Sequence, residues 1–363
     1  MKVLIVTGSS GGHIFPAASL TEELIALDQS TQVLLLLPER SKISLDIPAG
    51  CAVVYSKAPR LVPAFSRSGI KSLWGIFKAA CQDARVLLNF KPDVVVGFGS
   101  IDSVCLVFLA WFFRMKTIIH EQNVIPGKAN RFLAKLVDKA AVSFEQTIPR
   151  LRVNKEKAVL TGNPLRKGIS RLERKTASGY FGFQEDKFTL LVCGGSQGSS
   201  KVNAVFADAF SALPGREKLQ LIHLSGKQDY ELLKKRYAKE GVRAQVFDFF
   251  SPMHYAYSAS DLVVCRAGAT TISELIFFAL PALLLPYPYA YAHQAANAGI
   301  LTSAGCALAI EDSKLSEANL RSILGRLVGS REELERMRQS YGKFNLLDAA
   351  GKLAFEVSNL NAL

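Results

Sequence analysis

Apolar runs in the first half of the chain continue without a polar residue at every second position. They read "KVLIV" (2–6), "QVLLLL" (32–37), "DVVVGFG" (93–99) and "TIIHEQN" (117–123). Such runs are typical of parallel strands that are covered on both faces. Segments with helical spacing separate them, the first from Pro16 to Leu27 and the last reaching Leu136. The pattern therefore predicts an α/β fold.

The second half restarts the same order of elements. "FTLLVCGG" (188–195) predicts a strand, a helix follows over roughly 201–213, and "LQLIHLSG" (219–226) predicts the next strand. "DLVVCRAGATTISELIFFALPALLLPYP" continues as strand, loop, helix and strand. Two such halves predict two doubly wound parallel-sheet domains, which we bound at 1–162 and 163–340 with a hinge at Asn163-Pro164. The helical tail, 341–363, is expected to pack back on the first domain.

Length and composition agree with two globular domains. The chain has 363 residues, of which 49% are hydrophobic and 21% charged. Its opening, "MKVLIVTG", is interrupted by glycine too early for a signal peptide. The longest apolar run, Val104 to Phe113, is too short for a membrane span, which needs about twenty residues. We therefore expect a soluble chain made in the cytoplasm, and its six scattered cysteines predict no disulfide or metal site.

The net charge of +13 is compatible with three kinds of anionic partner: nucleic acid, membrane surfaces and phosphorylated substrates. Nucleic acid is disfavoured because no known nucleic-acid-binding motif occurs. Residues 66–90 combine an apolar helical face with a basic border. This helix either docks on the core with solvated lysines or touches an anionic membrane. The membrane alternative would use Ile70, Lys71, Trp74, Phe77 and Lys78.

A glycine-rich loop, "GSSGGH" (8–13), follows the first predicted strand. Bare backbone before a helix lets an anion approach unpaired N–H groups, here near Ser10, Gly11 and Gly12. The loop lacks the GxGxxG pattern and a closing acidic residue, so we discount a Rossmann dinucleotide site. His13 either caps the helix or serves as a general base or phosphate partner, because histidine exchanges protons near neutral pH.

The second half contains two further loops that precede a helix and can bind an anion. "GGSQGS" (194–199) is another anion-binding turn, so a pair of phosphate-bearing substrates is predicted in a cleft between the domains. In "CRAGATTISE", a helix begins near Thr270 and offers its start to a phosphate. Glu274 in that helix either complements the helix dipole or accepts both hydroxyls of a ribose.

Two polar clusters complete the motifs. "YAHQAANA" supplies His293, Gln294 and Asn297 as partners for sugar hydroxyls, and "IIHEQNVIPGKANR" places four polar residues, 120–123, at the carboxyl end of a strand. No D-x-D motif and no metal-ligand spacing occurs, so no metal is predicted. Arg166 and the loop amides would then neutralise a leaving group.

Six blocks carry a family resemblance: "GSSGGHIFPA", "HEQNVIPGKANR", "TGNPLR", "CGGSQGSSKVN", "CRAGATTISE" and "HQAANA". In this order they resemble the MurG family of N-acetylglucosaminyltransferases of peptidoglycan synthesis. The resemblance implies a GT-B fold, two Rossmann-like domains facing a cleft. It implies an inverting hexosyltransferase without a metal cofactor, moving N-acetylglucosamine from UDP-N-acetylglucosamine to undecaprenyl-diphosphate-linked muramyl-pentapeptide. Peripheral attachment to the cytoplasmic face of the bacterial inner membrane is implied too, as are roles in cell shape and division and contacts with other cell-wall or division proteins.

Site residues follow from the resemblance. The second domain would hold the donor, with Glu274 on the ribose and Gln294 on the sugar. The other donor residues would be Arg166, Ser196 and Gln197 near the diphosphate and uridine, Ala269, Thr270 and Thr271 at the phosphates, and Phe249 and Phe250 beside the uracil. The first domain would bind the acceptor diphosphate at Ser10, Gly11, Gly12, His13 and Asn123, with His13 as the base.

One block departs from the family pattern. The family's second glycine loop reads like GMGGYxSxP, whereas this chain has "GFGSIDSVC" (97–105). Ser100 and Ile101 replace a glycine and a tyrosine, and Asp102 adds a negative charge where the acceptor diphosphate is expected. The acceptor therefore stays open at this point. The alternatives are a GT-B transferase with another lipid acceptor such as a diacylglycerol, an epimerase acting on UDP-N-acetylglucosamine, and a non-catalytic UDP-sugar-binding paralogue.

Overall fold

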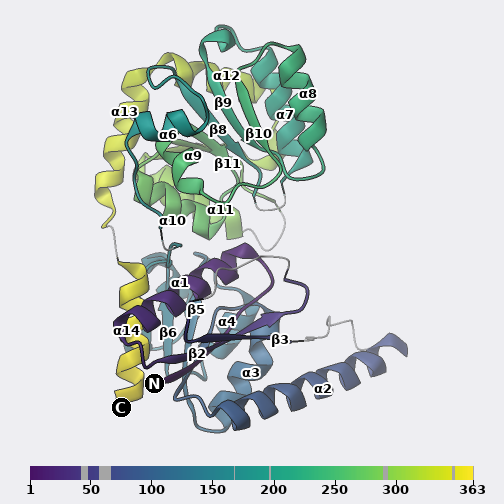
Figure 1. Cartoon of the computed structure of the whole chain (residues 1–363), viewed down its shortest axis with the longest axis vertical. Coiled ribbons are helices and arrows are strands. Elements are labelled where there is room, and N and C mark those ends of the chain that lie inside the picture. The colour runs from purple at the N-terminus through teal and green to yellow at the C-terminus, as the bar shows by residue number, and fades with distance from the viewer. Residues whose placement is uncertain are drawn as a thin grey trace. The chain divides into compact units, whose positions relative to one another are not determined.

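The structure is a computed structural model that describes residues 1–41, 48–56, 67–166, 168–195, 198–288, 293–345 and 348–362, with side chains at 67–77 and 79 left undescribed. The chain divides into two compact units (Figure 1). The first comprises Met1–Lys167 and Leu347–Leu363, and the second comprises Gly168–Leu346.

The first unit is built on a seven-stranded parallel sheet with the order β3-β2-β1-β4-β5-β6-β7. The chain runs outward from β1 to β3 and then returns to place β4 on the other side of β1. Ligands of doubly wound sheets bind outside the carboxyl ends of the strands at such a switch point. The strands are β1 (Lys2–Val6), β2 (Gln32–Pro38), β3 (Cys51–Ser56), β4 (Val94–Gly97), β5 (Lys116–Glu121), β6 (Lys139–Val142) and β7 (Ala158–Leu160).

Helices cover both faces of this sheet, which explains the continuous apolar runs. Val3 and Ile5 of β1 point into one buried cluster, whereas Leu4 and Val6 point into another, because successive strand side chains alternate. The helices are α1 (Gly11–Leu27), α2 (Arg67–Phe90), α3 (Ile101–Phe112), α4 (Lys128–Leu133), α5 (Ile148–Leu151) and α14 (Ala349–Ala362). From the chain's last segment, α14 packs against α1 and adds Leu353 to the first cluster.

The second unit contains a six-stranded parallel sheet with the order β10-β9-β8-β11-β12-β13. Its strands are β8 (Thr189–Cys193), β9 (Gln220–Leu224), β10 (Ala244–Phe247), β11 (Leu262–Cys265), β12 (Ala282–Leu284) and β13 (Ala307–Ala309). Its helices are α6 (Arg174–Tyr180), α7 (Ser200–Ser211), α8 (Tyr230–Lys239), α9 (Met253–Ala259), α10 (Ala269–Phe278), α11 (His293–Ala304), α12 (Glu317–Gly329) and α13 (Arg331–Ser340).

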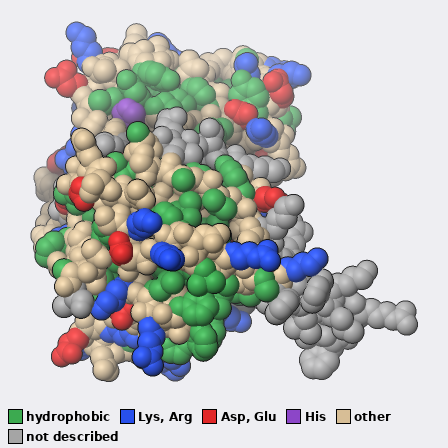
Figure 2. Space-filling view, turned by 60° about the horizontal axis from the view of Figure 1, so that its bottom comes forward, with side chains coloured by type: hydrophobic (Ala, Val, Ile, Leu, Met, Phe, Trp, Pro, Cys, Tyr) green, Lys and Arg blue, Asp and Glu red, His purple; other side chains and the backbone are tan. Residues whose placement is uncertain are grey.

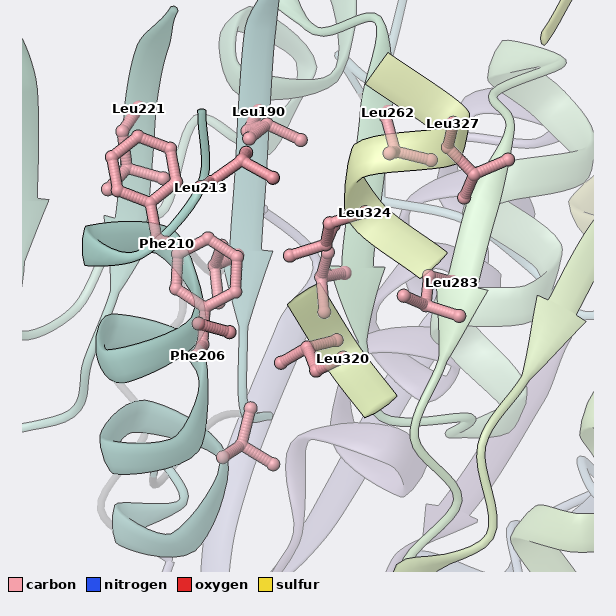
Figure 3. Packing of buried hydrophobic residues seen from close by; sticks show 14 of the residues in the cluster. Leu190, Phe206, Phe210, Leu213, Leu221, Leu262, Leu283, Leu320, Leu324 and Leu327 are labelled. Atoms are coloured by element: carbon pink, nitrogen blue, oxygen red, sulfur yellow. The ribbon is translucent and has the colours of Figure 1, made fainter. Parts of the chain in front are cut away.

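One face of the second sheet is buried by α7 and α12. Phe206 and Phe210 of α7 pack against the β8 side chain Leu190, and Leu320 and Leu324 of α12 fill the neighbouring space (Figure 3). The predicted class, α/β with two doubly wound parallel sheets, is confirmed.

One boundary differs from the sequence prediction in a way that matters for the site. The first helix was expected from Pro16, but α1 begins at Gly11 and contains Pro16 in its interior. Proline lacks an N–H and disfavours the interior of a helix, which is why the sequence pointed to a later start. Gly11, Gly12 and His13 consequently form the first helical turn rather than a loop.

Candidate functional site

The first glycine loop joins β1 to α1 and closely approaches the loop after β4. A Cβ on Gly8 would lie 2.5 Å from the Cβ of Ser100 and 2.9 Å from the Cδ2 of His13, so this approach requires glycine. Ser10 precedes α1 without a side-chain cap. The first amides of a helix have no intrahelical partner, so the N–H groups of Gly11 and Gly12 can bind an anion.

His13 is oriented by the β4 loop. Its Nδ1 lies 2.7 Å from the carbonyl oxygen of Phe98. A carbonyl oxygen only accepts, so Nδ1 carries the proton and the neutral ring keeps its lone pair on Nε2. The same carbonyl accepts a hydrogen bond from Gln122 Nε2 at 3.2 Å. His13 therefore presents a proton acceptor at a defined position.

His120 is a buried structural residue. Its Nε2 donates to the Gly162 carbonyl oxygen at 2.9 Å, and its Nδ1 accepts from Gln122 Nε2 at 3.2 Å. Burial lowers the pKa of His120 to about 4, so the ring is neutral near pH 7.

Glu121 organises the loop that follows β5. Oε1 of this buried carboxylate accepts from the backbone N of Asn123 at 2.8 Å and from Asn123 Nδ2 at 3.2 Å. Its Oε2 accepts from the Gly127 amide at 3.0 Å and from Asn130 Nδ2 at 2.9 Å. The polar cluster after β5 thus fixes the backbone at Asn123, whose role toward an acceptor stays a prediction.

Asp102, the unexpected charge in the second glycine loop, is paired. Its side chain is 2% exposed, and both carboxylate oxygens accept from Arg40 Nη2, at 2.6 and 2.5 Å. Arg40 Nε also donates to Ser9 Oγ at 3.3 Å. Arg40 was not predicted from the sequence. Its only signal there is its position shortly after a predicted strand, which many residues share.

Arg166, predicted for the donor, belongs to the first unit. Its guanidinium lies 3.7 Å from the centroid of the Phe15 ring of α1. A cation stacked at this distance on an aromatic face is held in place. The structure therefore groups Arg166 with the α1 residues, and its contact with a donor stays a prediction.

In the second unit, the loop after β8 requires glycine. A Cβ on Gly194 would lie 2.6 Å from the Ser199 amide nitrogen, and one on Gly198, where φ is +78°, would lie 2.2 Å from the Ser225 carbonyl oxygen. Such close approach of backbone to backbone leaves room for no side chain. Ser196 and Gln197, predicted for this loop, lie outside the described residues.

Helix α10 starts at the carboxyl end of β11, which neighbours β8. Gly268 precedes it, and Ala269, Thr270 and Thr271 form its first turn. Glu274 lies one turn further along and is 4% exposed. The hydroxyl of Tyr257, on α9, donates to Glu274 Oε2 at 2.8 Å. Sequence reasoning missed Tyr257, because nothing in its spacing distinguishes it from a core residue.

Two further side chains brace this loop. Gln294 Oε1 accepts from the backbone N of Ala267 at 3.1 Å and of Tyr287 at 2.9 Å. Both bonds are accepted by the side-chain oxygen, and the contact of Gln294 with a sugar stays a prediction. Buried Arg266, which was also missed, donates to Ser199 Oγ at 3.1 Å and to the Leu285 carbonyl oxygen at 2.8 Å. Arg266 thereby connects the loops after β8, β11 and β12.

Phe249 and Phe250 follow β10 and differ in exposure. Phe250 is 7% exposed and packs against Phe247 and Phe181, with ring centroids 4.7 and 5.5 Å away. Phe249 is 53% exposed. Only Phe249 therefore offers a large ring surface to a base, and both roles stay predictions.

The predicted membrane residues lie on α2. The side chains of Ile70, Lys71, Trp74 and Phe77 lie outside the described residues, and Lys78 is exposed. The adjacent α3 was not part of the prediction, yet it exposes aromatic rings, and Figure 2 shows hydrophobic side chains gathered among Lys and Arg side chains on this unit. The exposed rings are Phe108, Trp111, Phe112 and Phe113, together with Phe132 of α4.

The described residues lack two features, a membrane-spanning helix and a metal-binding cluster. No helix among them combines the length and hydropathy needed to cross a membrane. The same part of the chain holds no group of three or more His, Cys, Asp or Glu side chains arranged for a metal ion.

Comparison with known proteins identifies glycosyltransferase domains in both halves of the chain. Residues 3–142 match the glycosyltransferase family 28 N-terminal domain, and residues 189–353 match the family 28 C-terminal domain. A relative from Myxococcus xanthus is 35% identical over 98% of this chain and 91% of its own length. One from Thermodesulfovibrio yellowstonii is 34% identical over 94% and 95%. Both are named UDP-N-acetylglucosamine–N-acetylmuramyl-(pentapeptide) pyrophosphoryl-undecaprenol N-acetylglucosamine transferase.

Solved structures share the fold. The crystal structure of Acinetobacter baumannii MurG matches with a TM-score of 0.77 and 24% identity, over 99% of each chain. The GT-B architecture is therefore common to this chain and to that enzyme.

Proposed function

The chain belongs to glycosyltransferase family 28, and on this premise we propose that it converts lipid I to lipid II. It moves N-acetylglucosamine from UDP-N-acetylglucosamine to the muramyl 4-hydroxyl of undecaprenyl-diphosphate-linked muramyl-pentapeptide. The observation that carries this proposal is the 35% identity over 98% of the chain to a relative named for that transfer.

The donor binds to the second unit. Glu274, held by Tyr257, accepts the ribose hydroxyls, and the Nε2 donors of Gln294 contact the sugar. The first turn of α10 and the glycine loop after β8 receive the diphosphate, because helix amides favour anions. We assign Ser196 and Gln197 to the diphosphate and uridine, and exposed Phe249 meets the uracil.

The acceptor binds to the first unit. Its diphosphate lies over the amides of Gly11 and Gly12 beside Ser10, and Asn123 borders the sugar. Nε2 of His13 removes the proton from the muramyl 4-hydroxyl. The oxygen forms a bond to the anomeric carbon as the bond from that carbon to UDP breaks, which inverts the configuration. Amides, together with Arg166, stabilise the departing UDP.

The same unit docks on the anionic cytoplasmic face of the inner membrane. Trp111 and Phe112 of α3 are exposed aromatic rings, a residue type that favours the membrane interface. The neighbouring helix α2 packs against α3 and exposes Lys78 and Arg85, whose charge attracts anionic lipid. This arrangement brings the site close to a lipid-linked substrate.

Transfer of radiolabelled N-acetylglucosamine to lipid I in anionic vesicles tests the proposal, with and without EDTA. We expect labelled lipid II in both reactions. Failure with lipid I but labelling of diacylglycerol would replace the acceptor, and formation of UDP-N-acetylmannosamine without acceptor would indicate an epimerase. Binding of UDP without turnover on any of these would support a non-catalytic protein.

A further inference from the structure

Three neighbouring strands of the first unit contribute to one polar cluster. β2, β1 and β4 are adjacent in the sheet. Arg40 and Ser9 lie in the loops after β2 and β1, and Asp102 lies in the first turn of α3, which follows β4. Ser9 directly precedes Ser10 and the open first turn of α1. Ser100, whose hydroxyl donates to Asp102 Oδ2 at 3.1 Å, also borders Gly8 and His13 through the close approach described above. The cluster is therefore part of the rim of the first glycine loop.

The contacts of Arg40 use one edge of its guanidinium. Nη2 bonds to Asp102 and Nε bonds to Ser9, whereas Nη1 takes part in neither contact. The guanidinium is a rigid plane, so fixing this edge also fixes the direction of the Nη1 donors. The side chain of Arg40 is 36% exposed and that of Asp102 is 2% exposed, so the cation rather than the anion faces solvent.

We propose that Arg40 is a further binding residue for the acceptor's diphosphate and that Asp102 is the positioning residue that holds it. The inference rests on the proposed function, since it places a prenyl-linked diphosphate at the first glycine loop. It also accounts for the departure from the family pattern: the carboxylate brings a guanidinium to the loop instead of repelling the substrate.

Binding of geranyl diphosphate to the full-length chain, measured by calorimetry without donor, tests the pair. Arg40→Gln should weaken binding roughly ten- to a hundredfold, the value of a charge-assisted contact. Asp102→Asn should weaken it about threefold to tenfold, because the cation stays but loses its fixed direction. The double variant should bind several-fold more tightly than Arg40→Gln, since no unpaired carboxylate faces the phosphates. In turnover, the KM for lipid I should rise with these losses while the Kd for UDP stays constant.

Lys139→Gln is the matched control. Lys139, at the start of β6, pairs with Glu356 of α14, and two strands separate β6 from β1 in the sheet. Loss of this pair should change thermal stability but not diphosphate binding. Arg40→Gln that lowers the Tm with an unchanged Kd would reduce the pair to a structural ion pair. Asp102→Asn that binds more tightly than the unmodified chain would identify the carboxylate as repulsive. Either result overturns the proposal.

Failure of the proposed function and failure of the role of Arg40 and Asp102 give different results. If the unmodified chain binds geranyl diphosphate and transfers no sugar to lipid I, the proposed function fails and the variants still decide the role of the pair. If it transfers sugar and Arg40→Gln leaves both the Kd and the KM unchanged, only the pair fails.

Discussion

Replacing Tyr257 with phenylalanine removes one hydroxyl and keeps the buried ring. Tyr257 is 1% exposed, and its ring centroid lies 5.0 Å from that of Phe278. Burial raises the pKa of Tyr257 well above its usual range, so the phenol stays protonated and donates to the Glu274 carboxylate. The substitution therefore isolates one hydrogen bond to a residue that we place on the donor's ribose.

The magnitude follows from the nature of this bond. A hydrogen bond to a charged group contributes about 1.5–3 kcal/mol, so Tyr257→Phe should lower the free energy of unfolding by roughly that amount. The Glu274 carboxylate also loses the contact that orients it, which should weaken UDP binding about threefold to tenfold. Glu274→Ala removes the carboxylate itself and should cost about 1.5–3 kcal/mol of UDP affinity.

The assay compares UDP with 2′,3′-dideoxy-UDP by calorimetry, alongside urea unfolding. Both variants should lose affinity for UDP and little for the dideoxy ligand, which lacks the hydroxyls that Glu274 accepts. Tyr237→Phe is the control, because the Tyr237 hydroxyl makes an equally buried bond of 2.8 Å to His223. It should lower stability without changing UDP binding. Equal losses for both ligands in Tyr257→Phe would refute the reasoning.

Three other predictions test separate parts of the molecule. His13→Ala should lower kcat about 10²- to 10⁴-fold in the lipid I assay while UDP binding is unchanged, and a loss below tenfold would exclude His13 as the base. Burial lowers the pKa of His120 to about 4 and of His223 to about 3, so the unfolded chain binds protons first on acidification. The free energy of unfolding should fall from pH 6.5 towards pH 4.5 by roughly 1.4 kcal/mol per pH unit and site, measured by urea titration, and a flat profile would contradict this. Phe112→Ser should reduce co-sedimentation with anionic vesicles at least fivefold with turnover on detergent-solubilised acceptor retained, whereas equal sedimentation would remove α3 from the membrane surface.

The sequence predicted the fold where burial leaves a simple pattern. β1 and β8 are covered on both faces, so their apolar runs identify them directly. β7 and β13 contain three residues each, too few to show any period, and they were missed. β3, β6 and β10 were missed too. For helix α3, the segment was visible in the sequence but its buried face was not. Its apolar run was evident, but the sequence could not separate buried Leu106 from exposed Phe112.

The candidate site was predictable only where a motif is local. The glycine loops and the α10 start stand out as short strings of residues. Arg40 and Asp102 are 62 positions apart, and Tyr257 and Glu274 are 17 apart on different helices. Pairings of this kind depend on strand order and helix packing, so a single sequence does not reveal them.

The return of α14 to the first unit sets an order for biosynthesis. Leu353, Val357 and Leu360 cover the same sheet face as Val3 and Ile5. A ribosome has to translate the entire second unit before this cover emerges, so the nascent amino-terminal half must wait with an apolar surface open to chaperones. Domains usually complete folding in the order of synthesis, whereas here the half that is made first is finished last.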